Sequence, residues 1–192
     1  MSPNVNLSLK SGPASGPAPS FVNALHADGP APDRAGEMGL YGWLIGAWEM
    51  DVLVHLENDA EYRGKGEIHF GWVLEGRAIQ DVWITPRRGE RDGPIGAAAN
   101  FYGSTFRIYD PGIEAWHIFW LDPVKQFYSR MIGRADGPDI EQLTVNETPR
   151  RRWRFSAITP DSFRWTADID EGKDGAVAWH RHVEFFARRI AG

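Results

Sequence analysis

The sequence contains no cysteine in its 192 residues. Disulfide bonds, thiolate catalysis, iron–sulfur clusters and cysteine-based zinc sites are therefore excluded. Lysine is also scarce, with four residues against 17 arginines, and the formal net charge of −5 argues against a nucleic-acid-binding surface. No apolar run approaches the roughly 18 residues of a membrane-spanning helix. Because residues 1–20 lack the pattern of a secretory signal, we expect a cytoplasmic protein that contacts no membrane.

Several enzyme signatures are absent as well. The sequence has no P-loop, no dinucleotide-binding glycine motif after a strand, no Gly-x-Ser-x-Gly elbow and no His-Glu-x-x-His zinc motif. What the chain does have is aromatic residues, including nine tryptophans, within a hydrophobic fraction of 42%. That fraction supports a packed core, and the length fits one domain.

The chain divides into three parts by composition. Residues 1–20 are rich in proline, glycine and serine, which is typical of a flexible tail. Residues 21–44 show helix-like spacing of apolar side chains, and Ser20 is placed to cap a first helical turn. Residues 45–190 alternate short aromatic and β-branched runs with turn residues, and we expect them to form the folded domain.

Ten such runs follow one another without an intervening helix, which predicts an all-β protein built as an antiparallel meander. Closing the sheet into an up-and-down barrel removes its exposed edges, and ten strands leave an interior that can hold a small ligand. The predicted strands are 46–57, 61–74, 77–86, 99–109, 113–121, 124–134, 138–146, 150–158, 162–170 and 175–188.

The hydrophobic pattern also predicts which face of some strands points inward. A three-residue loop at 160–162 pairs Ala157 with Trp165 and Phe155 with Ala167, which gathers the apolar side chains on one face. The run 115–121 is apolar on both faces, so we expect the N-terminal helical segment or a second subunit to cover its outer side. A homodimer is therefore expected. The long charged loop 87–95 is expected at the barrel mouth.

Five sequence stretches resemble a known family. They are the Gly-x-Trp turn at 45–48, GWVLEGRAIQDVW at 71–83, RIYDP at 107–111 with Trp116 after it, ITPDSFRW at 158–165 and DGAVAW at 174–179. In this order they resemble a bacterial family of lipocalin-like domains of unknown function over residues 38–190. That family belongs to the calycin group, with lipocalins, fatty-acid-binding proteins and haem-binding nitrobindins.

The resemblance implies a ten-stranded calycin-like barrel with a pocket for a small, mainly apolar molecule, and it implies no defined reaction. The longer nitrobindin signature is missing, because Glu49-Met50-Asp51 follow Trp48. This departure argues against haem. We expect no cofactor, with haem or a divalent metal as the alternative.

A first candidate site combines His69 and Asp81 in the hairpin 67–85. With a three-residue loop at 75–77 the two side chains become diagonal neighbours on one face, able to act as general base and orienting group. With a two-residue loop, Asp81 instead joins Phe70 and His69 points away. A structural pair or an exposed histidine is the alternative interpretation.

A second candidate is Arg107, which a four-residue loop at 111–114 places beside Ile118, with Tyr109 opposite Trp116. An arginine between aromatic rings can anchor a ligand carboxylate, or simply pair with a structural acid. A third is the His180-x-His182-x-Glu184 pattern, a metal-ligand set if it faces inward. The better apolar face of that strand carries Trp179 and Phe185, which predicts outward histidines and an inward Arg181.

Our leading hypothesis from the sequence is the binding of one small hydrophobic or aromatic molecule in a tryptophan-lined cavity. The expected ligand-binding residues are Trp48, Trp83, Arg107, Trp116, Trp120, Trp153, Trp165, Trp179 and Arg181. The alternatives are a cofactor-independent isomerase, cyclase or dehydratase using His69 and Asp81, a haem or metal protein using His117, His180 or His182, and a purely structural module. Whether the protein is an enzyme stays open at this point.

Overall fold

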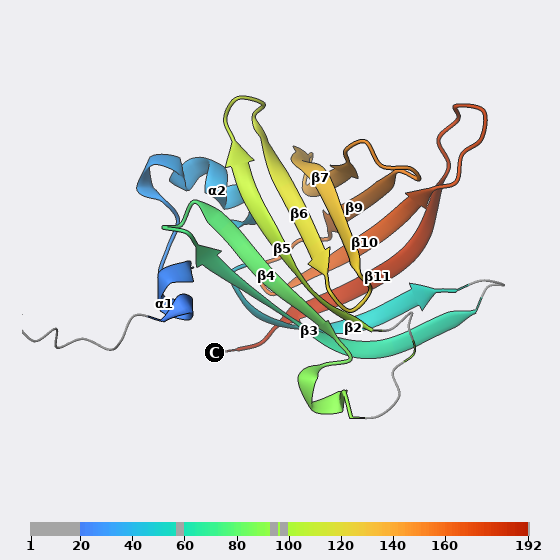
Figure 1. Cartoon of the computed structure of the whole chain (residues 1–192), viewed down its shortest axis with the longest axis horizontal. Coiled ribbons are helices and arrows are strands. Elements are labelled where there is room, and N and C mark those ends of the chain that lie inside the picture. The colour runs from blue at the N-terminus through green and yellow to red at the C-terminus, as the bar shows by residue number, and fades with distance from the viewer. Residues whose placement is uncertain (1–19, 57–59, 93–95, 97–99, 192) are drawn as a thin grey trace, which may run out of the picture.

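A closed antiparallel barrel forms the body of the protein (Figure 1). The computed structural model describes residues 20–56, 60–92, 96 and 100–191. Its ten barrel strands are β2 (Gly46–His55), β3 (Glu61–Val73), β4 (Ala78–Thr85), β5 (Phe101–Asp110), β6 (Ala115–Asp122), β7 (Phe127–Asp136), β8 (Asp139–Thr144), β9 (Arg151–Ser156), β10 (Ser162–Asp170) and β11 (Trp179–Arg189). Each strand pairs with the next, and β11 pairs with β2 to close the barrel. The predicted fold class is confirmed.

A short helical segment precedes the barrel. It contains α1 (Phe21–Leu25), the two-residue strand β1 (His26–Ala27), a 3-10 turn at Pro32–Arg34 and α2 (Ala35–Gly42). The side chain of Ser20 accepts a hydrogen bond from the backbone N–H of Asn23 at 3.2 Å, so the predicted cap is confirmed. The predicted tail at 1–20 lies, apart from Ser20, outside the described residues.

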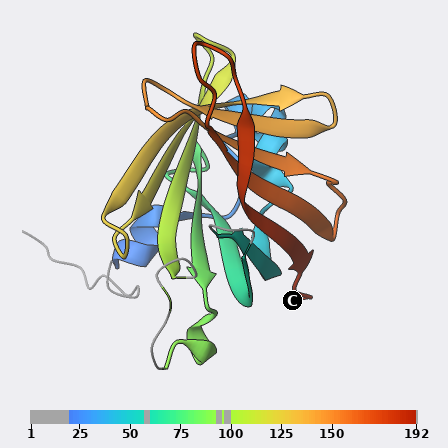
Figure 2. The ribbon, with the colours of Figure 1, turned by 90° about the vertical axis from the view of Figure 1, so that its right-hand side faces the viewer.

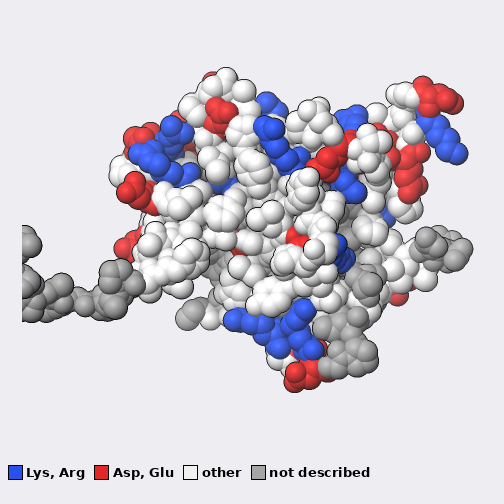
Figure 3. Space-filling model, viewed as in Figure 1, with Lys and Arg blue, Asp and Glu red and all other residues white. Residues whose placement is uncertain are grey.

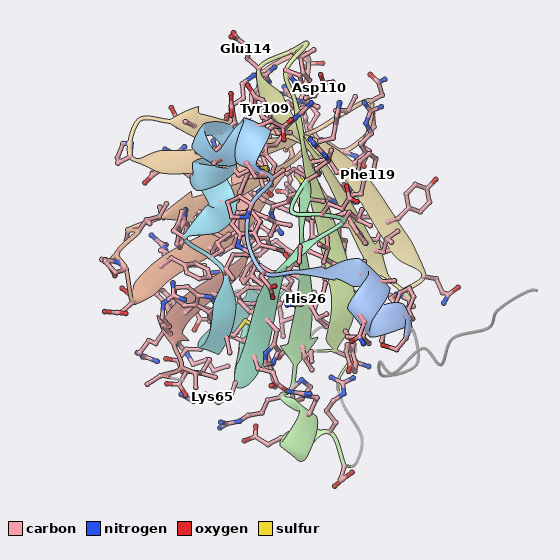
Figure 4. All side chains as sticks on the ribbon, turned by 90° about the vertical axis from the view of Figure 1, so that its left-hand side faces the viewer. His26, Lys65, Tyr109, Asp110, Glu114 and Phe119 are labelled. Carbon is pink, nitrogen blue, oxygen red and sulfur yellow. The ribbon has the colours of Figure 1, made fainter. Side chains whose placement is uncertain are left out.

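Helix α2 lies across one end of the barrel, and in Figure 4 Tyr109 and Asp110 are next to it. It inserts Met38 and Tyr41, both fully buried, among the aromatic side chains of that end. The rings of Tyr41 and Trp116 meet edge to face, with centroids 4.9 Å apart. We call this end the closed half, defined by Tyr41, Trp43, Trp48, Trp116, Phe155 and Phe163.

Two hairpin registers test the predicted pairings of inward residues. In β5–β6, Tyr109 pairs with Trp116 and Arg107 with Ile118, as predicted. In β9–β10 the predicted inward face is correct, but Phe155 pairs with Trp165, so the register is two residues from the prediction. The predicted turn is too short there because Ala157 has a left-handed backbone (φ 50°) and belongs to the loop.

The outer face of β5–β7 is largely apolar and remains exposed among the described residues. Phe119 and Leu121 are 37% and 49% exposed, and Tyr128 reaches 76%. Figure 3 shows a mainly uncharged surface over β4–β6, and Figure 4 shows Phe119 on the outside of the barrel. The expectation that the helical segment 21–44 covers this face is wrong, because α2 packs into the barrel end and β1 pairs with β3; cover by a second subunit stays a prediction. No helix in the described ranges has the length and apolarity needed to cross a membrane.

Candidate ligand-binding site

The barrel interior holds a cavity of about 250 Å³ at the end opposite α2. Its lining residues come from β2, β4–β7 and β9–β11, so the barrel wall itself shapes it. They are Met50, Trp83, Phe101, Thr105, Arg107, Trp120, Asp122, Lys125, Phe127, Arg151, Trp153, Trp165, Ala167, Asp168, Ile169, His182, Val183 and Phe185. In Figure 2, β11 runs in red across the front of the barrel and contributes the last three.

Aromatic side chains form most of the cavity wall. Trp165 stacks on Phe185 with ring centroids 5.0 Å apart and planes 12° from parallel. Trp83 contacts both of these rings, and Trp153 bridges Trp165 and Trp120. These contacts fix the rings in place, which makes the cavity a preformed, largely apolar site.

A buried ion pair lies at the inner end of the cavity. The guanidinium of Arg107 donates to Oδ2 of Asp81, and the backbone N–H of Thr105 donates to Oδ1 at 2.7 Å. Both charged side chains are at most 1% exposed. The guanidinium carbon of Arg107 also lies 5.3 Å from the ring centre of Tyr41, so this pair separates the cavity from the closed half.

The closed half has a polar contact of its own, on its side of the Asp81–Arg107 pair. The amide of Gln142 donates to the hydroxyl of Tyr41 at 2.9 Å. Burial raises the pKa of Tyr41 to about 12, against the opposing effect of the Arg107 cation. Tyr41 is therefore a neutral phenol that belongs to the core and not to the cavity.

Charged groups gather at the open end. Nζ of Lys125 lies 3.5 Å above the ring centre of Phe101. The guanidinium carbon of Arg151 lies 5.0 Å from the ring centre of Phe127. Asp122 is 2% exposed, and its Oδ1 accepts the backbone N–H groups of Val124 and Lys125 at 3.0 and 3.1 Å. The acid thus shapes the β6–β7 turn that carries Lys125.

A β-bulge in β11 changes the facing of the His180–Glu184 segment. Ala167 pairs with Val183 but Asp168 pairs with Arg181, so His182 is an extra residue in the strand. His182 therefore lines the cavity mouth next to Val183. Burial, followed by the charge of Lys125, lowers the pKa of His182 below its usual 6.5.

The same bulge overturns the prediction of an inward Arg181. Its Nε donates to Asp168 and its guanidinium lies 3.5 Å from Glu184, on the outer face. Glu184 also accepts from Arg164 at 2.8 Å and contacts His55 at 3.2 Å. Glu184 thus lies away from His182, and the described residues contain no group of three or more potential metal ligands. His117 likewise lies on the outer side, 2.9 Å from Asp110.

The predicted contact between His69 and Asp81 is wrong. Phe70 pairs with Asp81 and His69 with Val82, which is the two-residue-loop alternative. Three successive left-handed residues from Leu74 to Gly76 make this tighter turn. His69 therefore points outward, where its Nε2 lies 2.9 Å from Glu67.

The predicted tryptophans divide into three groups. Trp83, Trp120, Trp153 and Trp165 line the cavity, as does Arg107. Trp48 and Trp116 are instead buried in the closed half, where Nε1 of Trp48 donates to the carbonyl of Leu44 at 2.7 Å. Trp179 lies outside the cavity because its ring packs on the guanidinium of Arg152, 4.6 Å away. The sequence could not separate these groups, because it does not show which barrel end α2 fills.

The sequence interpretation missed the mouth residues Phe101, Lys125, Phe127 and Arg151. Lys125 follows the Asp122-Pro123 turn signal, and a carboxylate two or three residues before backbone N–H groups is the signature of an Asx turn. That signal places Lys125 at a strand end but not at the cavity. The predicted mouth loop 87–95 does begin at the right end, because it follows β4 and leads to β5, which begins with Phe101.

Comparisons with known proteins bear on the fold. No protein-family model and no curated protein sequence matches the chain. Among solved structures, Rv2717c from M. tuberculosis is similar with a TM-score of 0.53 and 12% identity, covering 82% of this chain and 99% of that one. The S-type phycobiliprotein lyase CPES from Guillardia theta is similar with a TM-score of 0.51 and 14% identity, covering 80% and 93%. The chain therefore has a lipocalin-like fold of the calycin type.

Proposed function

We propose that this protein binds one small, mainly apolar molecule, with an aromatic or alicyclic body, in the barrel cavity. The observation that carries the proposal is an open cavity of about 250 Å³ walled by Trp83, Trp120, Trp153 and Trp165. Protein interiors are normally close-packed, and the closed half of this barrel is packed in that way. An unfilled, aromatic-walled space in the other half is what a ligand site requires.

The size of the cavity favours a small ligand. Ligand pockets commonly measure about 300–1,000 Å³, and this one is slightly below that range. A compact ring system fits such a space better than a long acyl chain. The phycobiliprotein lyase shows by its name that a similar barrel has an enzymatic role in another protein, but a shared fold does not transfer a reaction.

The two other functional hypotheses have less support from the geometry. The enzyme hypothesis relied on His69 and Asp81 in contact, and these side chains point to opposite sides of the barrel wall. Asp81 is also already paired with Arg107, so it is not a free base. The metal hypothesis relied on His180, His182 and Glu184 sharing a face, and the bulge at His182 separates them.

The test is fluorescence titration with N-phenyl-1-naphthylamine, a neutral apolar probe that accepts energy from nearby tryptophans. The proposal predicts saturable, one-site binding to the wild-type protein. Ala167 lines the cavity, so Ala167→Leu should abolish binding by filling the space. Ala135 is exposed at the end of β7, which makes Ala135→Leu the matched control that keeps binding. Binding that survives Ala167→Leu unchanged would place the probe elsewhere and contradict the proposal.

A further inference from the structure

We propose that the ligand carries an anionic group, a carboxylate on an apolar body, and that the ammonium of Lys125 receives it at the cavity mouth. The inference rests on the proposed function and adds the chemical class of the ligand. It also assigns the recognition of the charged group to the mouth of the barrel and not to Arg107 at its inner end.

Lys125 is a cation that makes no ion-pair contact with a carboxylate of the described residues. Its ammonium lies on the ring of Phe101 and lines the cavity, yet no carboxylate of the described residues is within ion-pair distance of it. By contrast, Lys65 on the outer face pairs with Asp51. Partial burial lowers the pKa of Lys125 below its usual value, because the ammonium has lost part of its hydration and the nearby charge of Asp122 only partly offsets that loss. A ligand carboxylate would restore the favourable interaction that burial has removed.

The surroundings of Lys125 add positive potential. Arg151 and His180 stand near the same opening as His182, and both of them, with Lys125 and His55, act on the charge of His182. Arg151 already has an acidic partner, Glu147, at 2.9 Å. The basic groups therefore surround the mouth, and Lys125, unlike Arg151, has no carboxylate within ion-pair distance in the described part of the chain.

The acids that line the cavity, Asp122 and Asp168, are engaged by protein donors. Oδ1 of Asp122 accepts two backbone N–H groups, and its Oδ2 is buried without a hydrogen-bond partner. The carboxylate of Asp168 accepts from Arg152 on the outer face at 2.9 Å and from Arg181. Two arginines thus offset the charge of Asp168, and Asp122 is the acid of the cavity lining that is left to repel a bound anion.

The inner end of the cavity is less favourable than the mouth for the anionic group. The guanidinium of Arg107 is matched by Asp81, and both are at most 1% exposed. A second carboxylate there would face Asp81 in a region of low dielectric, where like charges repel strongly. The ligand is therefore oriented with its apolar body toward Trp83 and Trp165 and its charge toward solvent.

The experiment compares two fluorescent probes that share an N-phenylnaphthylamine body. One is the neutral N-phenyl-1-naphthylamine, and the other is its sulfonate, 1-anilinonaphthalene-8-sulfonate, whose charge stands in for the carboxylate. We expect Lys125→Met to weaken sulfonate binding about tenfold, the usual effect of losing one charged contact, and to leave neutral-probe binding within about twofold. Lys125→Arg should restore sulfonate binding. Lys65→Met removes an outer lysine and is the matched control.

The outcomes separate the two proposals. Equal affinity losses for both probes in Lys125→Met, or equal sulfonate losses in Lys65→Met and Lys125→Met, would overturn the role of Lys125 while leaving cavity binding intact. Binding of neither probe to the wild-type protein would instead refute the proposed function itself. The near-ultraviolet circular dichroism of each variant confirms that the aromatic interior is still folded.

Discussion

The buried pair of Asp81 and Arg107 gives the sharpest energetic prediction. Both side chains are at most 1% exposed, and Arg107 is enclosed by the rings of Tyr41, Phe70 and Phe155 at 5.3, 5.5 and 5.8 Å. In Asp81→Asn the cation keeps its burial and loses its counterion. Removing one member of such a pair costs about 3–5 kcal/mol, since a buried charge is left unmatched.

The complementary change, Arg107→Met, leaves the carboxylate of Asp81 with only the N–H of Thr105 as a close partner. We expect a similar loss of about 3–5 kcal/mol for this variant. The double variant Asp81→Asn, Arg107→Met removes both charges and keeps the volume of the side chains. It should lose about 1–3 kcal/mol, less than either single variant, because a buried pair is often nearly neutral against an apolar replacement.

Urea unfolding followed by tryptophan fluorescence measures all three free energies of unfolding. Arg188→Met is the matched control, because Arg188 is 55% exposed and pairs with Asp51 at 2.8 Å on the outer face. Exposed pairs contribute about 0–1 kcal/mol, so this control should stay close to wild type. The reasoning fails if either single variant loses less than about 1 kcal/mol, or if the losses in the double variant simply add.

Three further predictions concern the mouth, the closed half and the outer face. Lowering the pH from 7.5 to 5.5 should strengthen sulfonate-probe binding in titrations, because protonation of His182, whose pKa lies below its usual 6.5, adds positive charge beside Lys125, Arg151, His180 and His55. His182→Gln should lose most of that gain. Gly133→Ala should lower the free energy of unfolding by about 1–3 kcal/mol, because the added Cβ would clash with the hydroxyl of Tyr41. The Cβ of Gly71→Ala would meet open space, so this control should not lower the free energy of unfolding in that way. The expected homodimer predicts a sedimentation mass of twice the 21.6 kDa chain, and Phe119→Glu on the exposed apolar face should shift it toward the monomer.

The fold could be predicted from the sequence because its signals are local. Turn residues mark nearly every strand end, and alternation along β9 and β10 assigns Trp153, Phe155 and Trp165 to the interior. The β5–β6 register also follows from the length of its turn. The β3–β4 register does not, since two loop lengths are compatible with residues 74–77 and only the backbone conformation there selects one.

The site was only partly predictable because it depends on non-local features. The bulge at His182 reverses the facing of Arg181, and no residue type in β11 marks it. Trp48 and Trp83 are equally inward by alternation, yet α2 fills the half of the barrel that contains Trp48. Which inward residues meet a ligand is thus determined by the packing of a segment far away in the sequence.

A last prediction distinguishes a ligand site from a packing defect. Ala167 lies on the cavity wall between Trp153 and Val183, its partners on the neighbouring strands. Ala167→Leu adds three carbon atoms to a cavity of about 250 Å³, which has room for them. At about 0.8 kcal/mol per buried carbon, the upper limit of the gain is about 2 kcal/mol, and we expect about 1 kcal/mol after loss of side-chain entropy.

The variant should therefore be more stable in urea and unable to bind the neutral probe, while Ala135→Leu changes neither property. This combination would show that the open cavity is kept at some loss of stability, which is expected when function requires the space. A less stable Ala167→Leu protein that still binds the probe would mean that the aromatic wall relaxes around added volume. The proposed site depends on a rigid aromatic wall, and that description of the barrel interior would then be wrong.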